Sequence, residues 1–77
     1  MNDTNDKICE LLEFYKTKNI SVHLNLEYGK WLNGKIISIS ETKDRFVFQE
    51  DKFGEMLVFF DRLDQTNPIE PKKEGEK

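Results

Sequence analysis

The chain has 77 residues and a formal net charge of −3, so it forms at most one small domain and is not a strongly basic nucleic-acid-binding protein. A single cysteine excludes an internal disulfide, and a single histidine without a ligand cluster around it argues against a metal site or a cofactor. Because no apolar run could span a membrane and the acidic start does not resemble a signal peptide, we expect a cytoplasmic protein.

A helix is predicted over residues 4–17. Asp3 or Thr4 can cap its start, because their side-chain oxygens accept hydrogen bonds from free backbone N–H groups. One apolar stripe with helical spacing is formed by Ile8, Leu11, Leu12 and Tyr15. Lys16 and Lys18 follow at the C-terminal end, where the helix dipole favours cations.

After the helix, the apolar pattern changes to a period of two, which is typical of half-buried strands. Apolar residues alternate with polar ones at Ile20, Val22, Leu24 and Leu26. We expect strands at about 20–27, 31–40, 45–49, 55–60 and 62–67, although Leu63 is the only apolar residue in the last of these. The polar and charged segment 68–77 is predicted to be disordered, which leaves residues 1–67 as the domain.

Short antiparallel strands joined by tight turns predict a mainly β fold, in which the N-terminal helix precedes a strongly bent, five-stranded small barrel. Gly34 interrupts the second strand, and we interpret it as the point where that strand bends. Gly29 lies in the preceding turn, where a residue without a Cβ can adopt a positive φ.

The segments ISVHLNLEYG and KWLNGKIISIS follow the helix and carry these two glycines five positions apart. This arrangement resembles the Sm-like family, and within it the Hfq branch of bacterial RNA chaperones. Pro68 and Pro71 also stand where that family closes its fold. The resemblance implies an SH3-like barrel and a homo-oligomeric ring, with a hexamer favoured and a heptamer possible. It also implies non-catalytic binding of single-stranded RNA.

By this resemblance, an RNA surface is expected on one face of the first two strands. The positions that match the family's contacts there are Asn25, Lys30, Leu32 and Asn33, with Trp31 beside them. Lys16 and Lys18 match a basic rim, and Thr42 competes with Phe46 for a base-stacking position in the following turn. The candidate RNA-binding residues are therefore Lys16, Lys18, Asn25, Gly29, Lys30, Trp31, Leu32, Asn33, Thr42, Lys43 and Arg45.

Each of these residues also has an interpretation without RNA. Trp31 can stack a base, with Lys30 on a phosphate, or it can cover the junction between helix and barrel. Lys43 and Arg45 can contact phosphate or be ordinary solvated charges. The two lysines at the helix end can simply complement its dipole. His23, on the polar side of the first strand, is interpreted as a surface histidine.

The fourth predicted strand, EMLVFF, is apolar on both faces. Adjacent Phe59 and Phe60 must point to opposite sides of the strand, so both cannot fill the interior of one barrel. An unpaired strand of this kind invites association, and the resemblance implies pairing with the fifth strand of a neighbouring subunit. The expected subunit interface is Met56, Val58, Phe59, Phe60 and Leu63.

A second function class remains open. An SH3- or Tudor-like module that binds a peptide through exposed aromatic residues also fits the net negative charge, and it would be monomeric. An enzyme is not expected, since no paired-carboxylate, Cys/His or Ser/His arrangement stands out in the chain.

Overall fold

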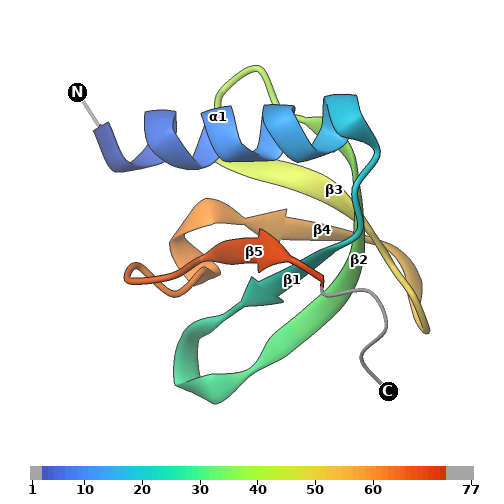
Figure 1. Cartoon of the computed structure of the whole chain (residues 1–77). Coiled ribbons are helices and arrows are strands. Elements are labelled where there is room, and N and C mark those ends of the chain that lie inside the picture. The colour runs from blue at the N-terminus through green and yellow to red at the C-terminus, as the bar shows by residue number, and fades with distance from the viewer. Residues whose placement is uncertain (1–2, 73–77) are drawn as a thin grey trace.

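The computed structural model describes residues 3–72, with the side chains of residues 5–72. One helix is followed by five strands and two single-turn 3-10 helices (Figure 1). The elements are α1 (Asp3–Lys18), β1 (Val22–Asn25), η1 (Glu27–Gly29), β2 (Trp31–Ile39), β3 (Arg45–Glu50), β4 (Gly54–Phe59), η2 (Phe60–Arg62) and β5 (Ile69–Pro71). The predicted helix and the first four strands are thus confirmed to within a few residues.

α1 rests on the sheet through its apolar stripe. Ile8 and Leu12 are buried, whereas Leu11, which the pattern placed in the stripe, is exposed. The helix ends at Lys18. The next residue, Asn19, has a φ of 56° that turns the chain, and the N–H of Ile20 donates to the Tyr15 carbonyl at 3.0 Å. This is a Schellman ending, in which a left-handed residue lets the last carbonyls find donors. Within residues 3–72, no helix has the length and apolar character needed to cross a membrane.

All five strands form one antiparallel sheet in the order β4-β3-β2-β1-β5. The expected closure into a barrel is absent from the described residues, because β4 pairs only with β3 and β5 pairs only with β1. The sheet instead curves beneath α1 as an open layer (Figure 1). Both outer strands therefore leave one backbone edge unpaired.

The fifth strand is not at residues 62–67, as predicted, but at Ile69–Pro71. Leu63 is buried and makes a single bridge to Leu26, while the Asp64 carboxylate accepts the N–H of Thr66 at 2.9 Å and holds a turn. The strand forms only where buried Ile69 supplies an apolar anchor. Part of the segment expected to be disordered is therefore a strand, and residues 73–77 lie outside the described part.

The two glycines in the opening of the sheet have different roles. Gly29 has a φ of +75°, as expected of a turn residue. The register irregularity of β2 lies between Ile36 and Ser38, and not at Gly34, where a bend was predicted. Gly34 is instead needed for close packing, since a Cβ there would lie 2.0 Å from the carbonyl oxygen of Gln49 on β3.

The core fills the space between α1 and the concave face of the sheet. Its buried apolar side chains are Ile8, Leu12, Val22, Leu24, Ile36, Phe46, Phe48, Val58, Phe60, Leu63 and Ile69. Three residues expected at a subunit interface, Val58, Phe60 and Leu63, are therefore inside the protomer. Val58 is buried on β4 itself, whereas the 3-10 turn η2 redirects the chain after β4 and turns Phe60 inward.

Candidate nucleic-acid interface

The outer face of β1 and β2, away from α1, carries four polar or aromatic side chains in two pairs. Asn25 lies opposite Trp31, and His23 lies opposite Asn33. Residues that face each other across two strands share a side of the sheet, as do residues two apart along a strand. The antiparallel hairpin thereby gathers these four side chains on one surface.

Trp31 is the dominant feature of this surface, with 58% of its area exposed. Its indole stacks on the His23 ring with the centroids 5.5 Å apart and the planes inclined by 26°. The Nδ1 of His23 donates to the Oδ1 of Asn33 at 2.7 Å, which fixes the imidazole beneath the indole. Trp31 thus stands in solvent rather than covering a helix junction, and it is held in place by side chains of both strands.

His23 was missed as a site residue by the sequence reasoning. Its isolation from carboxylates and nucleophiles suggested an ordinary surface histidine. The signal lay in the pairing, because a hairpin turning at residues 27–30 sets His23 diagonally across from Trp31. Cross-strand diagonals are within reach of aromatic side chains.

Asn25 has a different role from the one expected. Its amide nitrogen donates to the Asn67 carbonyl at 2.9 Å and to the Glu70 carboxylate at 3.0 Å. Both amide hydrogens are therefore used, one to hold the segment before β5 and one to hold Glu70 within β5. Asn25 therefore stabilises the sheet at the site, and only its side-chain oxygen remains to accept a hydrogen bond from a ligand.

The remaining candidate residues on the hairpin differ in how far they are exposed to a ligand. Lys30 is exposed at the start of β2, and none of the ion pairs among the described residues involves it. Leu32 is half-buried and packs against the core, so it positions its neighbours rather than contacting a ligand. Gly29 contributes an exposed turn. Lys30 is thus an exposed cation that precedes Trp31 in the chain.

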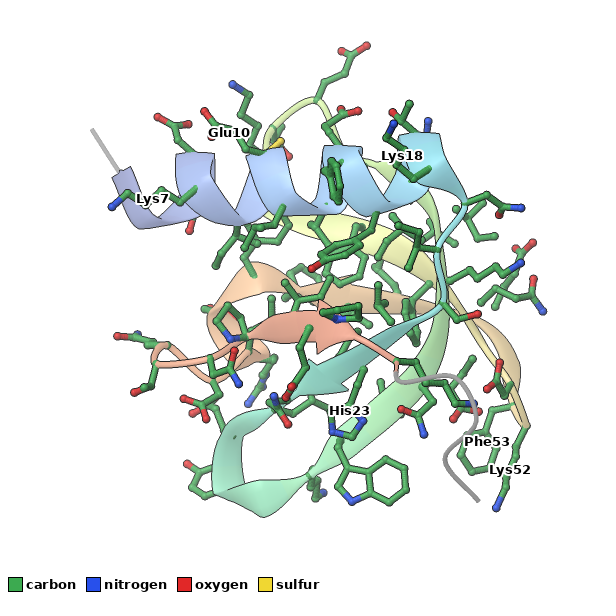
Figure 2. All side chains as sticks on the ribbon, in the orientation of Figure 1. Lys7, Glu10, Lys18, His23, Lys52 and Phe53 are labelled. Carbon is green, nitrogen blue, oxygen red and sulfur yellow. The ribbon has the colours of Figure 1, made fainter. Side chains whose placement is uncertain are left out.

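A surface pocket of about 350 Å³ adjoins Trp31 and Asn33 and extends to the β3–β4 turn. That turn contributes Lys52 and Phe53, and Phe53 is 76% exposed. Figure 2 shows His23 and Phe53 on the side of the sheet away from α1, where the hairpin and this turn lie. Sequence reasoning treated EDKFG as a connection only; an aromatic residue next to a lysine inside a turn was the available signal.

The β3–β4 turn is held by buried Glu50. Its carboxylate accepts the N–H groups of Lys52 at 2.6 Å and Phe53 at 2.8 Å. These donors, Phe53 first, lower the pKa of Glu50 below its usual value, because they stabilise the charged form. The Asp51 N–H also donates to the Asn33 carbonyl at 2.9 Å. The turn is therefore attached to the same strand that carries Trp31.

The candidates in the β2–β3 turn lie elsewhere. Nine-residue β2 separates them from Trp31, which corresponds to about 25 Å of extended chain. Arg45 binds the Asp44 carboxylate through Nε at 3.0 Å and Nη2 at 2.9 Å, and the Thr42 hydroxyl donates to the same carboxylate. Lys43 faces Asp6 of α1 at 3.9 Å. These residues make contacts within the protein, which favours the interpretation as ordinary surface charges.

The lysines at the end of the helix lie in a third, separate region of the surface. Lys16 and Lys18 are exposed in the last turn of α1. Figure 2 shows Lys18 on the opposite side of the sheet from His23, the residue on which Trp31 stacks. The structure does not bring them together with the hairpin residues in one chain. A ligand that contacted both groups would have to pass around the edge of the protomer.

β4 keeps part of the expected interface at its surface. Met56 is half-buried against the core, and Phe59 is exposed with the Arg45 guanidinium 4.9 Å from its ring centroid. Leu57 and Ile37 are also exposed on the sheet. The outer side of β2–β4 is therefore partly apolar.

No group of three or more histidine, cysteine, aspartate or glutamate side chains that could hold a metal ion occurs in the described part of the chain. Comparison of the chain with protein-family models, curated proteins and solved structures finds no match. The hairpin surface and the adjoining pocket are therefore the features of this chain that bear on its function.

Proposed function

We propose that this chain is a non-catalytic protein that binds single-stranded RNA on the outer face of β1 and β2. The observation that supports this most is Trp31, which is largely exposed and yet fixed against His23. A flat aromatic surface held ready in solvent suits stacking of an unpaired base. Lys30, the exposed residue before it in the chain, is a candidate cation for a phosphate.

The proposal includes an Sm-like fold and assembly of several chains into a ring, with a hexamer favoured and a heptamer possible. The free edges of β4 and β5 lie at opposite ends of one sheet, so each could pair with the other edge in a neighbouring copy. A ring would repeat a modest site several times. Several weak contacts to one RNA strand then act together through effective concentration, which an acidic protein needs.

Anisotropy of labelled oligo(A) and oligo(U), measured across a salt series, tests RNA binding. We expect binding that weakens as salt rises, because phosphate contacts release counterions. Trp31→Ala should weaken binding by about 5- to 150-fold, the usual effect of removing one stacking platform. Phe14→Ala is the control, since Phe14 is an exposed aromatic on α1. No binding at low salt would refute the proposal.

A peptide-binding module is the second candidate, and one observation favours it. Ile37, Leu57 and Phe59 leave apolar surface exposed on β2 and β4. Such a surface could receive an extended peptide along the β4 edge. A monomeric chain that ignores RNA and binds peptides with little salt dependence would support this candidate instead.

A further inference from the structure

We propose that the pocket between Trp31 and Phe53 receives one unpaired nucleobase of the RNA, while Lys52 contacts the neighbouring phosphate. This inference rests on the proposed RNA binding and adds to it a specific subsite, built partly by the β3–β4 turn. The base would lie between the aromatic rings of Trp31 and Phe53. The β3–β4 turn then acts as part of the ligand site and not only as a connection.

The two aromatic side chains both line the pocket of about 350 Å³ and come from different parts of the chain. His23 stacks on the indole but does not line the pocket, so a base that enters meets ring surface that His23 leaves free. Phe53 is 76% exposed and contributes almost nothing to the core. Its ring is therefore available to a ligand at little cost to the fold.

The Phe53 ring is carried by a fixed backbone. Glu50 accepts the N–H groups of both Lys52 and Phe53, and the Asp51 N–H donates to the Asn33 carbonyl. Two of these hydrogen bonds fix the shape of the turn, and the third attaches it to β2. A site that is ordered before binding loses less conformational entropy when the ligand arrives.

The charges around the pocket favour an anionic group at Lys52. The Asp51 carboxylate has its own cation, Lys72, at 3.3 Å. The Glu50 carboxylate is buried and is occupied by the two N–H donors of the turn. Lys52 is exposed and makes none of the ion pairs found among the described residues. It is therefore the cation that a phosphate at this pocket would meet.

Only a base that is not paired can enter such a pocket, because a duplex keeps its bases stacked inside the helix. A single-stranded oligonucleotide should therefore bind, and the same sequence in a duplex should not compete. This separates the pocket from a purely electrostatic surface, which would also bind the phosphates of a duplex.

The test compares Phe53→Ala, Phe53→Tyr and Lys52→Ala with the unchanged chain, using anisotropy of labelled oligo(A) and oligo(U). Trp31 is the single tryptophan, so quenching of its fluorescence reports directly on a base in the pocket. We expect Phe53→Ala to weaken binding by about 5- to 150-fold and Phe53→Tyr, which keeps the ring, to restore it. Lys52→Ala should reduce the slope of log affinity against log salt by about 0.7.

Phe14→Ala is the matched control, and thermal unfolding of every variant verifies that the fold is intact. If the unchanged chain binds RNA and Phe53→Ala binds equally well, the pocket inference is wrong while the Trp31 surface remains. If Phe53→Ala weakens binding but Trp31→Ala does not, a pocket shared by both rings is also refuted. If the unchanged chain binds no RNA at low salt, the pocket and the proposed function are both wrong.

Discussion

Tyr28 combines two features that a folded chain normally avoids. It has a φ of 63°, in the left-handed region, and its side chain is 89% exposed. A residue with a Cβ loses about 1–2 kcal/mol in this conformation. The hairpin imposes it, because Leu26 donates to the Lys30 carbonyl and Lys30 donates to the Glu27 carbonyl. The strain is stored at the tip of the hairpin that carries Trp31.

Replacing Tyr28 by asparagine should therefore stabilise the protein. Asparagine tolerates the left-handed region, so Tyr28→Asn should raise the free energy of unfolding by about 0.5–1 kcal/mol. Tyr28→Ala is the control, since it removes the ring but keeps the Cβ and the strain. Urea denaturation measures both. Equal stabilities of the two variants would show that the ring, and not the backbone, sets the energy at this position.

The pH response of Asp44 follows from its partners. Hydrogen bonds from Arg45 and then Thr42 lower the pKa of Asp44 to about 2, from a usual value of 3.8. A carboxyl whose pKa is lower in the folded state stabilises the fold above the unfolded pKa. That contribution is complete above about pH 4 and is lost as the pH falls toward 2.

We expect an NMR titration of the Asp44 carboxyl to have its midpoint near a pH of about 2, the folded value. Arg45→Gln should move the midpoint upward, because it removes the largest cause of the shift. Lys43→Gln serves as the comparison, since Lys43 pairs with Asp6 and not with Asp44. An ordinary midpoint in the unchanged chain would contradict the Arg45–Asp44 geometry.

At the scale of elements, the glycines offer a sharp comparison. Gly34→Ala should lower the free energy of unfolding by at least about 2–3 kcal/mol, since its Cβ would meet the backbone of β3, which cannot move aside. Gly54→Ala is the control: Gly54 has a φ of +87° but open space around it, so about 1–2 kcal/mol is expected. Chemical denaturation ranks the two variants. A smaller loss at Gly34 would mean that β2 and β3 can separate there.

The elements that the sequence predicted well are those in which a regular pattern coincides with burial. Alternation located β1, runs between turn sequences located β2 to β4, and helical spacing located α1. The last strand failed because Leu63 is a single apolar residue, and nothing local shows that its burial comes through a lone bridge to Leu26. The strand that does form, β5, has only three residues and likewise a single buried apolar residue, Ile69. Only the pairing with β1 distinguishes the two.

The candidate site was predicted in part for the same reason. Trp31 and its exposed neighbour Lys30 could be named from the sequence, because both follow the hairpin turn directly. Phe53 reaches the site only because Glu50 and Asp51 attach the β3–β4 turn to the chain near Asn33. Such contacts between distant segments depend on strand register, which a single sequence leaves open.

For the whole molecule, the question is whether the free edges of β4 and β5 are used. With Val58, Phe60 and Leu63 in the core, any ring must form through backbone edges and the exposed face of β4. The proposal predicts a single species of six or seven times the 9.2 kDa chain in light scattering after size-exclusion chromatography. Leu57→Lys on edge strand β4 should lower that mass, because a charged side chain beside a free edge opposes pairing.

Ile37→Lys is the matched control for this experiment. Ile37 is also an exposed apolar residue, but it lies on β2, which has paired strands on both sides. Assembly through edges predicts that Ile37→Lys keeps the full mass, whereas contact through the sheet face predicts that both variants lose it. A clean monomer of the unchanged chain would remove the ring. RNA binding would then depend on one Trp31 per molecule, and the peptide-binding candidate would become the stronger one.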